Sequence, residues 1–231
     1  IFDNAGQICS AGSRLLVDRP ILDAFIDRFC AYTRRSFVPG DPLDLETTLG
    51  PLASAPQRER VLSYLRTGAA EGARRLLGGA VPRQPAGAYL EPTLLCDVPA
   101  GSSLLREEIF GPVAIVQPID GIDGIDGIEE TIAVANDTQF GLAAGLWTSS
   151  LDTAISLSRR IEAGVVWVNC YDEGDMTQPF GGWKLSGHGR DKCIESILSY
   201  THSRSTWIRL RRGVPTQRRA GAACAEGGDG T

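Results

Sequence analysis

Residues 143–169 read AAGLWTSSLDTAISLSRRIEAGVVWVN, and this stretch decides the fold class. Its first six residues form an apolar run that predicts a strand, and residues 151–161 predict a helix. Gly164 then leads into VVWVN, an apolar run short enough for a central strand. A strand, a helix and a second strand in this order are typical of a parallel sheet covered by helices.

The same alternation continues outward in both directions. Further strands are predicted at 13–18, 74–77, 90–96, 113–119 and 205–210, and further helices at 21–29, 54–68, 128–136 and 190–200. The helix at 54 begins with a capping box, in which Ser54 precedes Gln57 by three residues. A glycine-rich loop occupies 170–189. We therefore expect an α/β fold with a largely parallel layered sheet.

Composition excludes several classes of protein. The 231 residues are 42% hydrophobic and carry a net charge of −5, which allows a core and gives no sign of a nucleic-acid-binding surface. No apolar run approaches the ~18 residues of a membrane helix, so no membrane span is expected. Residues 211–231 hold four arginines against two carboxylates and almost no large apolar side chain, and are expected to be a disordered tail.

Cysteine and histidine placement argues against a metal site. The six cysteines form no CxxC pair, and the only histidines are His188 and His202. Without a signal peptide, reduced cysteines and a cytoplasmic location are expected. The repeat IDGIDGIDG at 119–127 spaces its aspartates by three, whereas calcium loops space ligands by two. We interpret the repeat as a loop insertion.

Three segments could carry chemistry. The first is NAGQICSAG at 4–12, where small residues around Cys9 let a substrate carbon approach and let backbone N–H groups face an oxyanion. A lone cysteine is more often an inert apolar side chain, so both interpretations stay open.

The other two segments are EEIFGP at 107–112 and PFGGWKLSGHGRD at 179–191. In the former, a carboxylate suits a sugar diol and an aromatic face suits a flat heterocycle, and the alternative is a solvated turn with a buried Phe. The latter fits neither the Walker pattern nor GxGxxG. It is expected to bring Phe180 and Trp183 to a pocket wall, with simple loop packing as the alternative.

Six motifs in order resemble one family: NAGQICSAGSR, LEPTLL, EEIFGPV, NDTQFGLAAGLWT, AGVVWVN and PFGGWKLSGHGRD. Together, over roughly residues 1–210, they resemble the carboxy-terminal, catalytic-domain half of an NAD(P)-dependent aldehyde dehydrogenase. Residues 172–177, DEGDMT, are most similar to members acting on γ-glutamyl-aminobutyraldehyde and related amino-aldehydes.

The resemblance implies a role for each matched residue. Cys9 would be the nucleophile, forming a thiohemiacetal and then a thioester, with its own N–H as half of the oxyanion hole. Glu108 would hold the nicotinamide ribose of NAD or NADP, and Phe110 would lie beside the nicotinamide ring. Phe180 would form a wall of the aldehyde tunnel, and Asp175 would face the polar tail of the small-molecule aldehyde.

The resemblance also implies a domain organisation. Residues 1–203 would be a catalytic domain, incomplete at its amino terminus, whose last part reaches back toward a cofactor domain. Residues 204–210 would be an oligomerisation strand of a dimeric or tetrameric homo-oligomer. Most of the Rossmann-like cofactor domain, the water-activating glutamate and the oxyanion asparagine precede the nucleophile in this family.

Because the chain starts with Ile1 and not Met, we expect a fragment of a longer protein, poorly soluble and inactive alone. Two alternatives remain open. One is a non-catalytic truncated remnant or assembly module. The other is an aldehyde dehydrogenase that releases its thioester to coenzyme A.

Overall fold

Helices and strands alternate along the chain in the predicted order. The computed structural model describes residues 1–82, 86–121 and 125–209. The helices are α1 (Leu22–Ser36), α2 (Ala55–Ala70), α3 (Ser103–Arg106), α4 (Ile125–Asn136) and α5 (Leu151–Arg160), with 3-10 turns η1 (Asp3–Gly6), η2 (Arg19–Ile21) and η3 (Ile194–Tyr200). The strands are β1 (Arg14–Asp18), β2 (Arg74–Leu77), β3 (Thr93–Cys96), β4 (Val113–Ile119), β5 (Phe140–Gly141), β6 (Ala143–Leu146), β7 (Val165–Val168) and β8 (Trp183–Lys184).

The strands form mostly parallel pairs, which confirms the α/β prediction. The main sheet has the order β1-β4-β3-β2, in which β4 runs parallel to both β1 and β3 and only β2 is antiparallel. Strands β6 and β7 pair in parallel across α5, as residues 143–169 predict. This pair is a separate sheet, and β5 and β8 form a third, antiparallel one. The predicted α/β type with largely parallel pairing is therefore confirmed, but the strands form three separate sheets.

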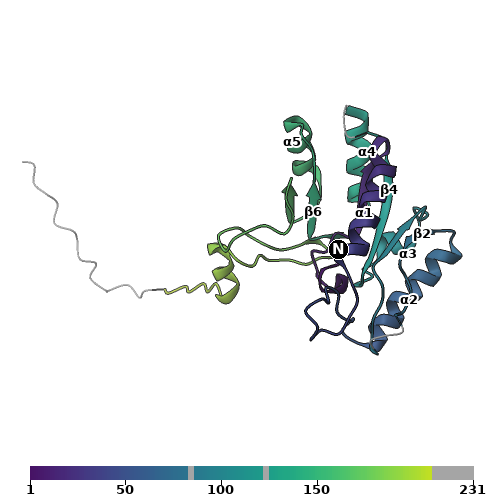
Figure 1. Cartoon of the computed structure of the whole chain (residues 1–231). Helices are drawn as coiled ribbons and strands as arrows, with labels where there is room; N and C mark the ends of the chain where they lie inside the picture. Colours follow the sequence, from purple (N-terminus) through teal and green to yellow (C-terminus); the bar gives the residue numbers. More distant parts are fainter. Residues whose placement is uncertain (83–85, 122–124, 210–231) are drawn as a thin grey trace, which may run out of the picture.

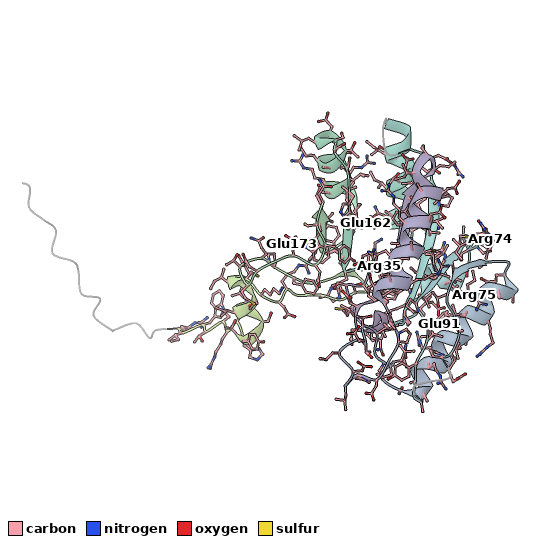
Figure 2. All side chains as sticks on the ribbon, in the orientation of Figure 1. Arg35, Arg74, Arg75, Glu91, Glu162 and Glu173 are labelled. Carbon is pink, nitrogen blue, oxygen red and sulfur yellow. The ribbon has the colours of Figure 1, made fainter. Side chains whose placement is uncertain are left out.

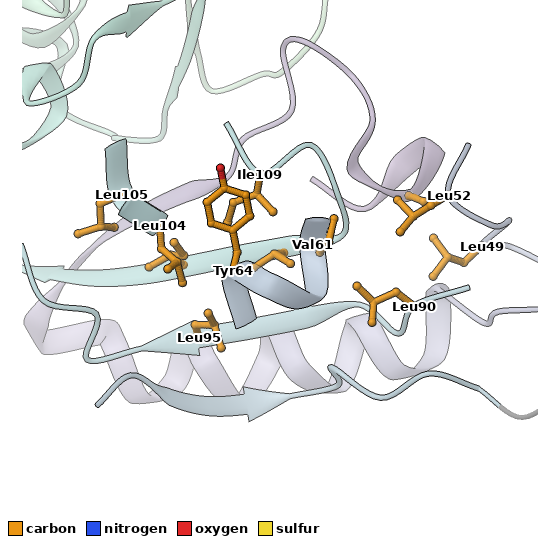
Figure 3. Packing of buried hydrophobic residues seen from close by; sticks show 12 residues of the cluster. Leu49, Leu52, Val61, Tyr64, Leu90, Leu95, Leu104, Leu105 and Ile109 are labelled. Atoms are coloured by element: carbon orange, nitrogen blue, oxygen red, sulfur yellow. The ribbon is translucent and has the colours of Figure 1, made fainter. Parts of the chain in front are cut away.

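The main sheet is buried on both faces. Alternate residues of β4 point to opposite sides: Val113 and Ile115 join one apolar cluster, and Ala114 and Val116 join the other. Figure 3 shows the first cluster, in which α2 contributes Val61 and Tyr64. On the other face, α1 packs the predicted apolar stripe, with Phe25, Ile26 and Phe29 against the second cluster. We call residues 1–121, with β1–β4 and α1–α3, the sheet lobe.

The rest of the chain has a much smaller core. One cluster of three buried residues, Ile132, Leu146 and Leu157, joins α4, β6 and α5. We call residues 170–209, beyond β7, the arm; β8 within it returns to pair with β5, and its last part, with η3, lies away from the sheet lobe in Figure 1. We call residues 140–209 the distal region.

The carboxyl end of α4 joins the two regions. The Arg14 guanidinium of β1 donates to the carbonyl oxygens of Val134 (3.2 Å) and Ala135 (2.7 Å). Lys184 of β8 donates to the carbonyls of Asn136 and Thr138, at 2.9 and 3.1 Å. These cations add hydrogen bonds at the carboxyl end of α4 and complement the helix dipole there. Burial lowers the pKa of Arg14.

Two predicted elements of the arm are wrong. Residues 190–193 are not helical, because Lys192 and Cys193 have left-handed φ angles of 59° and 47°, and only the 3-10 turn η3 follows. The strand predicted at 205–210 is not formed in residues 205–209, which pair with no described strand. A strand without a partner leaves its backbone groups to water. The oligomerisation role of 204–210 stays a prediction.

The repeat at 119–127 is not simply a loop insertion. Its first isoleucine ends β4, and residues 125–127 begin α4, one turn earlier than predicted. Ile128 and Ile132 of this helix pack in the cluster with Leu146 and Leu157. Residues 122–124 and the tail at 211–231 lie outside the described residues. Among the described helices, none is both long enough and apolar enough to span a membrane.

Candidate functional site

The segment that carries Cys9 packs directly on the loop that carries Glu108 and Phe110. Asn4, Ala5 and Gly6 all have left-handed φ angles, of 49°, 54° and 71°. A Cβ atom on Gly6 would meet the carbonyl oxygen of Gly111 at 2.1 Å, so only glycine allows this approach. The contact places the two predicted parts of the site side by side, next to the chain start in Figure 1.

Cys9 itself is exposed at the tip of a turn. The turn is closed by the Ala11 N–H, which donates to the Ile8 carbonyl at 3.0 Å. Within the described residues, the Cys9 N–H forms no hydrogen bond. An exposed thiol beside an unpaired N–H is an arrangement that can receive a carbonyl group and hydrogen-bond its oxygen.

The loop at 107–112 follows α3 and enters β4, on a connection as predicted. Ile109 is buried, whereas the Phe110 side chain is 37% exposed and its φ is 57°. The alternative of a turn with a buried Phe is therefore wrong: the isoleucine is the buried anchor. Glu108 is exposed. A free carboxylate and an exposed ring on one loop fit a ribose and a flat heterocycle, so these residues suit a dinucleotide.

Helix α2 holds this loop through three residues that sequence reasoning missed. The Gln57 amide donates to the Phe110 carbonyl at 2.8 Å, and Arg60 donates to the Glu108 carbonyl at 2.9 Å. The Tyr64 hydroxyl donates to the Glu107 carboxylate at 2.6 Å. Burial, followed by this carboxylate, raises the pKa of Tyr64.

The spacing of these residues was the available signal. Positions 57, 60 and 64 share one helix face, where polar groups interrupt an apolar stripe. The predicted capping box is only half formed, because the Gln57 side chain binds the 107–112 loop. The Ser54 hydroxyl accepts from the Gln57 N–H, but the Gln57 side chain reaches to the 107–112 loop instead of back to the helix start.

The glycine-rich loop reaches the Cys9 segment through one hydrogen bond. The Tyr171 hydroxyl donates to the Ser10 carbonyl at 2.5 Å. Figure 2 shows Glu173 where the arm begins, and the Trp167 indole N–H donates to its carbonyl at 2.6 Å. Further along, a Cβ atom on Gly164 would meet the Gly181 carbonyl at 1.7 Å, so the loop folds back tightly onto the start of β7.

Phe180 and Asp175 lie on the arm. Phe180 exchanges two backbone hydrogen bonds with Asp191, and the Lys192 ammonium lies 5.5 Å from the centre of its ring. The hydroxyl and N–H of Thr177 lower the pKa of the Asp175 carboxyl, which is exposed. Within the described chain, no hydrogen bond or ion pair joins Asp175 to residues 4–12. Trp183, predicted with Phe180 at a pocket wall, is half exposed in β8.

Other features lie away from this site. A cavity of about 440 Å³ between the end of α1 and β2 contains none of the predicted site residues. The five cysteines in the described ranges carry free thiols. Over those same ranges, no group of three or more His, Cys, Asp or Glu side chains is arranged to hold a metal ion.

Comparisons with known proteins identify the family. Residues 1–206 match the profile described as "Aldehyde dehydrogenase family". Betaine aldehyde dehydrogenase 1 of Rhizobium meliloti (strain 1021) is 43% identical over 209 residues, 90% of this chain and 42% of that protein. A betaine aldehyde dehydrogenase of Brucella melitensis biotype 2 is 41% identical over 212 residues, again 90% and 42%.

Solved structures show the same relationship. An indole-3-acetaldehyde dehydrogenase complexed with NAD+ has a TM-score of 0.81 and 45% identity, over 89% of this chain and 40% of that one. The aldehyde dehydrogenase KauB from Pseudomonas aeruginosa has a TM-score of 0.81 and 44% identity, with the same coverage. The chain thus spans about two fifths of the length of the relatives it matches. With a profile match over 206 of its 231 residues, this protein belongs to the aldehyde dehydrogenase family.

Proposed function

We propose that this chain supplies the nucleophile and one wall of the dinucleotide site of an NAD(P)-dependent aldehyde dehydrogenase, which oxidises an aldehyde to the carboxylic acid. The observation that carries the proposal is the contact of Gly6 with Gly111, because it sets the Cys9 turn against the loop of Glu108 and Phe110.

The chemistry assigned to the chain's own residues begins at Cys9. Its thiolate adds to the aldehyde carbon, and the carbonyl electrons move to oxygen, giving a thiohemiacetal anion that the unpaired Cys9 N–H stabilises. Loss of hydride from that carbon leaves a thioester on Cys9. Water then adds to the thioester carbonyl, the acid departs, and the thiol returns to its starting state.

Glu108 and Phe110 are the residues proposed to hold the cofactor. The Glu108 carboxylate accepts hydrogen bonds from a ribose diol, and the exposed face of Phe110 covers the nicotinamide. NAD or NADP, when bound, supplies the hydride acceptor. Arg60 and Gln57 keep the backbone of this loop in place, so that both side chains face outward from a fixed support. Complexes of relatives with NAD support the assignment.

For the substrate we propose an amino-aldehyde, with γ-glutamylamino-aldehydes among the candidates. The arm presents exposed carboxylates at Asp172, Glu173 and Asp175 before Phe180, the proposed tunnel wall. The exposed Asp175 carboxylate, whose pKa is further lowered by Thr177, is charged at neutral pH and can attract an ammonium group. Several relatives are named betaine aldehyde dehydrogenases, whose name also describes a cationic aldehyde.

Turnover is proposed to require polypeptide beyond this chain. Large apolar side chains such as Leu198, Tyr200 and Trp207 are 70–94% exposed on the arm, and the matched relatives are more than twice as long. We propose that these surfaces are covered in a homo-oligomer containing the remaining portion, in the reducing cytoplasm. A non-catalytic remnant and a coenzyme A-acylating enzyme remain the alternatives.

Alkylation of Cys9 tests the nucleophile. Iodoacetamide at neutral pH should react with Cys9 faster in the native chain than in the same chain unfolded in urea, because activation comes from folded surroundings. Mass spectrometry of peptides gives the rate at each cysteine, and the half-buried Cys193 serves as an internal control. A native rate at Cys9 equal to or below the unfolded rate contradicts the proposal and favours the remnant.

Protection by aldehydes tests the substrate class. A cationic amino-aldehyde should protect Cys9 from iodoacetamide more strongly than a neutral aldehyde of equal length, since both form the thiohemiacetal but only one meets the acidic arm. The Asp175→Asn variant should lose the difference, and Asp152→Asn, an exposed acid on α5, should keep it. Equal protection by both aldehydes in the unaltered chain rules out the charge preference.

A further inference from the structure

Tyr171 packs between two tryptophan rings and a glycine, and it has no role in the proposed chemistry. Its ring lies 4.8 Å from the ring of Trp167 and is stacked at 9° and 6.2 Å on Trp147. Gly145 lies under the ring, where a Cβ would come within 2.5 Å of it. One tyrosine is thus fixed by β6 and β7, the two strands of the distal sheet.

The free end of this side chain meets the Cys9 segment. The hydroxyl donates to the Ser10 carbonyl at 2.5 Å, across 161 residues of sequence, and Gly12 leaves room for it. Burial, followed by the charge of Asp172, raises the pKa of Tyr171 to about 12. The hydroxyl therefore keeps its proton, and remains a neutral donor, at neutral pH.

The Ser10 carbonyl belongs to the peptide group that follows Cys9 by one residue. Fixing its direction limits rotation of the turn that carries the thiol and the unpaired Cys9 N–H. On the other side, Gly6 already anchors the segment to the sheet lobe. Beyond the turn, the Ser13 carbonyl accepts from the Ile115 N–H at 2.9 Å, so the Tyr171 hydroxyl fixes the turn between two anchors on the sheet lobe.

We infer that Tyr171 is a positioning residue that orients the Cys9 turn through the Ser10 carbonyl. The inference rests on the proposed function for its catalytic meaning. Its structural content, that the distal sheet holds the nucleophile segment, stands on the contacts alone. The distal region thereby acts on the nucleophile without supplying a reacting atom.

The test uses Tyr171→Phe, which keeps the ring and removes only the hydroxyl. Hydrogen exchange of the peptide covering residues 6–14 should become faster. The ratio of native to unfolded alkylation rate at Cys9 should fall by about threefold to tenfold, the ratio that corresponds to one lost hydrogen bond. The control is Tyr89→Phe, which alters a buried tyrosine of the sheet lobe and should leave both readouts unchanged.

Two further results separate the possible failures. If Tyr171→Phe does not fold, Gly145→Ala serves as the second variant, because its Cβ displaces the Tyr171 ring. It should likewise speed up exchange of residues 6–14 and lower the alkylation ratio at Cys9. Unchanged exchange of residues 6–14 in the variant overturns the inference, even if Cys9 is activated in the unaltered chain. Faster exchange with no activation of Cys9 in the unaltered chain upholds the positioning and overturns the proposed function.

Discussion

The sheet lobe and the distal region differ in how much of their own surface they bury. Both faces of the main sheet carry an apolar cluster, and residues such as Leu94 and Ile115 are essentially inaccessible to solvent. The distal region shares a single cluster of three buried residues, and η3 has none. One part of the chain therefore has an extensive apolar core of its own, and the other buries very little.

The candidate site lies on the boundary between the two. Cys9, Glu108 and Phe110 belong to the sheet lobe, and their segments are fixed by Gly6 and α2. Phe180 and Asp175 belong to the arm, whose shape is set by local turns. The segments that carry the proposed nucleophile and cofactor residues therefore touch each other within this chain, whereas the proposed substrate residues are not held against them.

The largest expected effect is the loss of packing in the main sheet. Leu94→Ala removes a fully buried side chain between β3 and α1, and should lower the free energy of unfolding by about 2–5 kcal/mol. Urea unfolding followed by circular dichroism measures it. Leu198→Ala, on the exposed arm, is the matched control and should change stability by less than ~0.5 kcal/mol. Equal losses of unfolding free energy in the two variants would contradict the difference in packing between the sheet lobe and the distal region.

The second largest effect is expected at the contact of Gly6 with Gly111. Gly6→Ala introduces a Cβ within 2.1 Å of a backbone oxygen at a φ of 71°, and should cost about 2–3 kcal/mol and alter the alkylation rate of Cys9. Gly72→Ala shares the positive φ, 95°, but faces open space. It should cost less and leave Cys9 unchanged. An unaltered alkylation rate at Cys9 in Gly6→Ala would show that the contact with the 107–112 loop does not affect the Cys9 thiol.

The connection through α4 is expected to contribute less. Arg14→Gln loses two hydrogen bonds to the carboxyl end of α4 and should cost about 1–2 kcal/mol, with hydrogen exchange rising in both α4 and β8. Arg19→Gln removes an exposed ion pair with Asp120 and should cost less than ~0.5 kcal/mol. If exchange in β8 does not respond to Arg14→Gln, α4 does not couple the regions.

A further effect appears only at high pH. Tyr171 has a pKa of about 12 in the folded chain against 10.0 for a free tyrosine, so the folded state keeps its proton where the unfolded state has lost it. Stability should therefore fall as pH rises from 10 to 12. Cys96, with a pKa of about 11, adds a change of the same sign. Subtracting the profile of Tyr171→Phe isolates the tyrosine, and identical profiles would contradict its burial.

Sequence patterns predicted the sheet lobe well because its elements carry their own signals. The stripe in α1, the apolar run of β4 and the unit at 143–169 all fold as predicted. The arm was mispredicted at 190–193 and 205–209, where backbone φ angles and an absent strand partner decide the structure and leave no periodic pattern. Long-range contacts were missed because a local pattern does not name a distant partner: the polar face of Gln57, Arg60 and Tyr64 marks a contact without identifying the 107–112 loop, and nothing near Tyr171 indicates Ser10, 161 residues away.

A crosslink between the Cys9 turn and the 107–112 loop tests most directly whether these two segments form one site. In Glu108→Cys, a short bismaleimide should join position 108 to Cys9, as identified by mass spectrometry of the linked peptides. In Glu59→Cys, an exposed position on α2, the same reagent should give no link to Cys9. Linking at 108 and not at 59 is the predicted result. Failure at 108, with both thiols singly modified, would show that Cys9 and the proposed cofactor loop do not share a site.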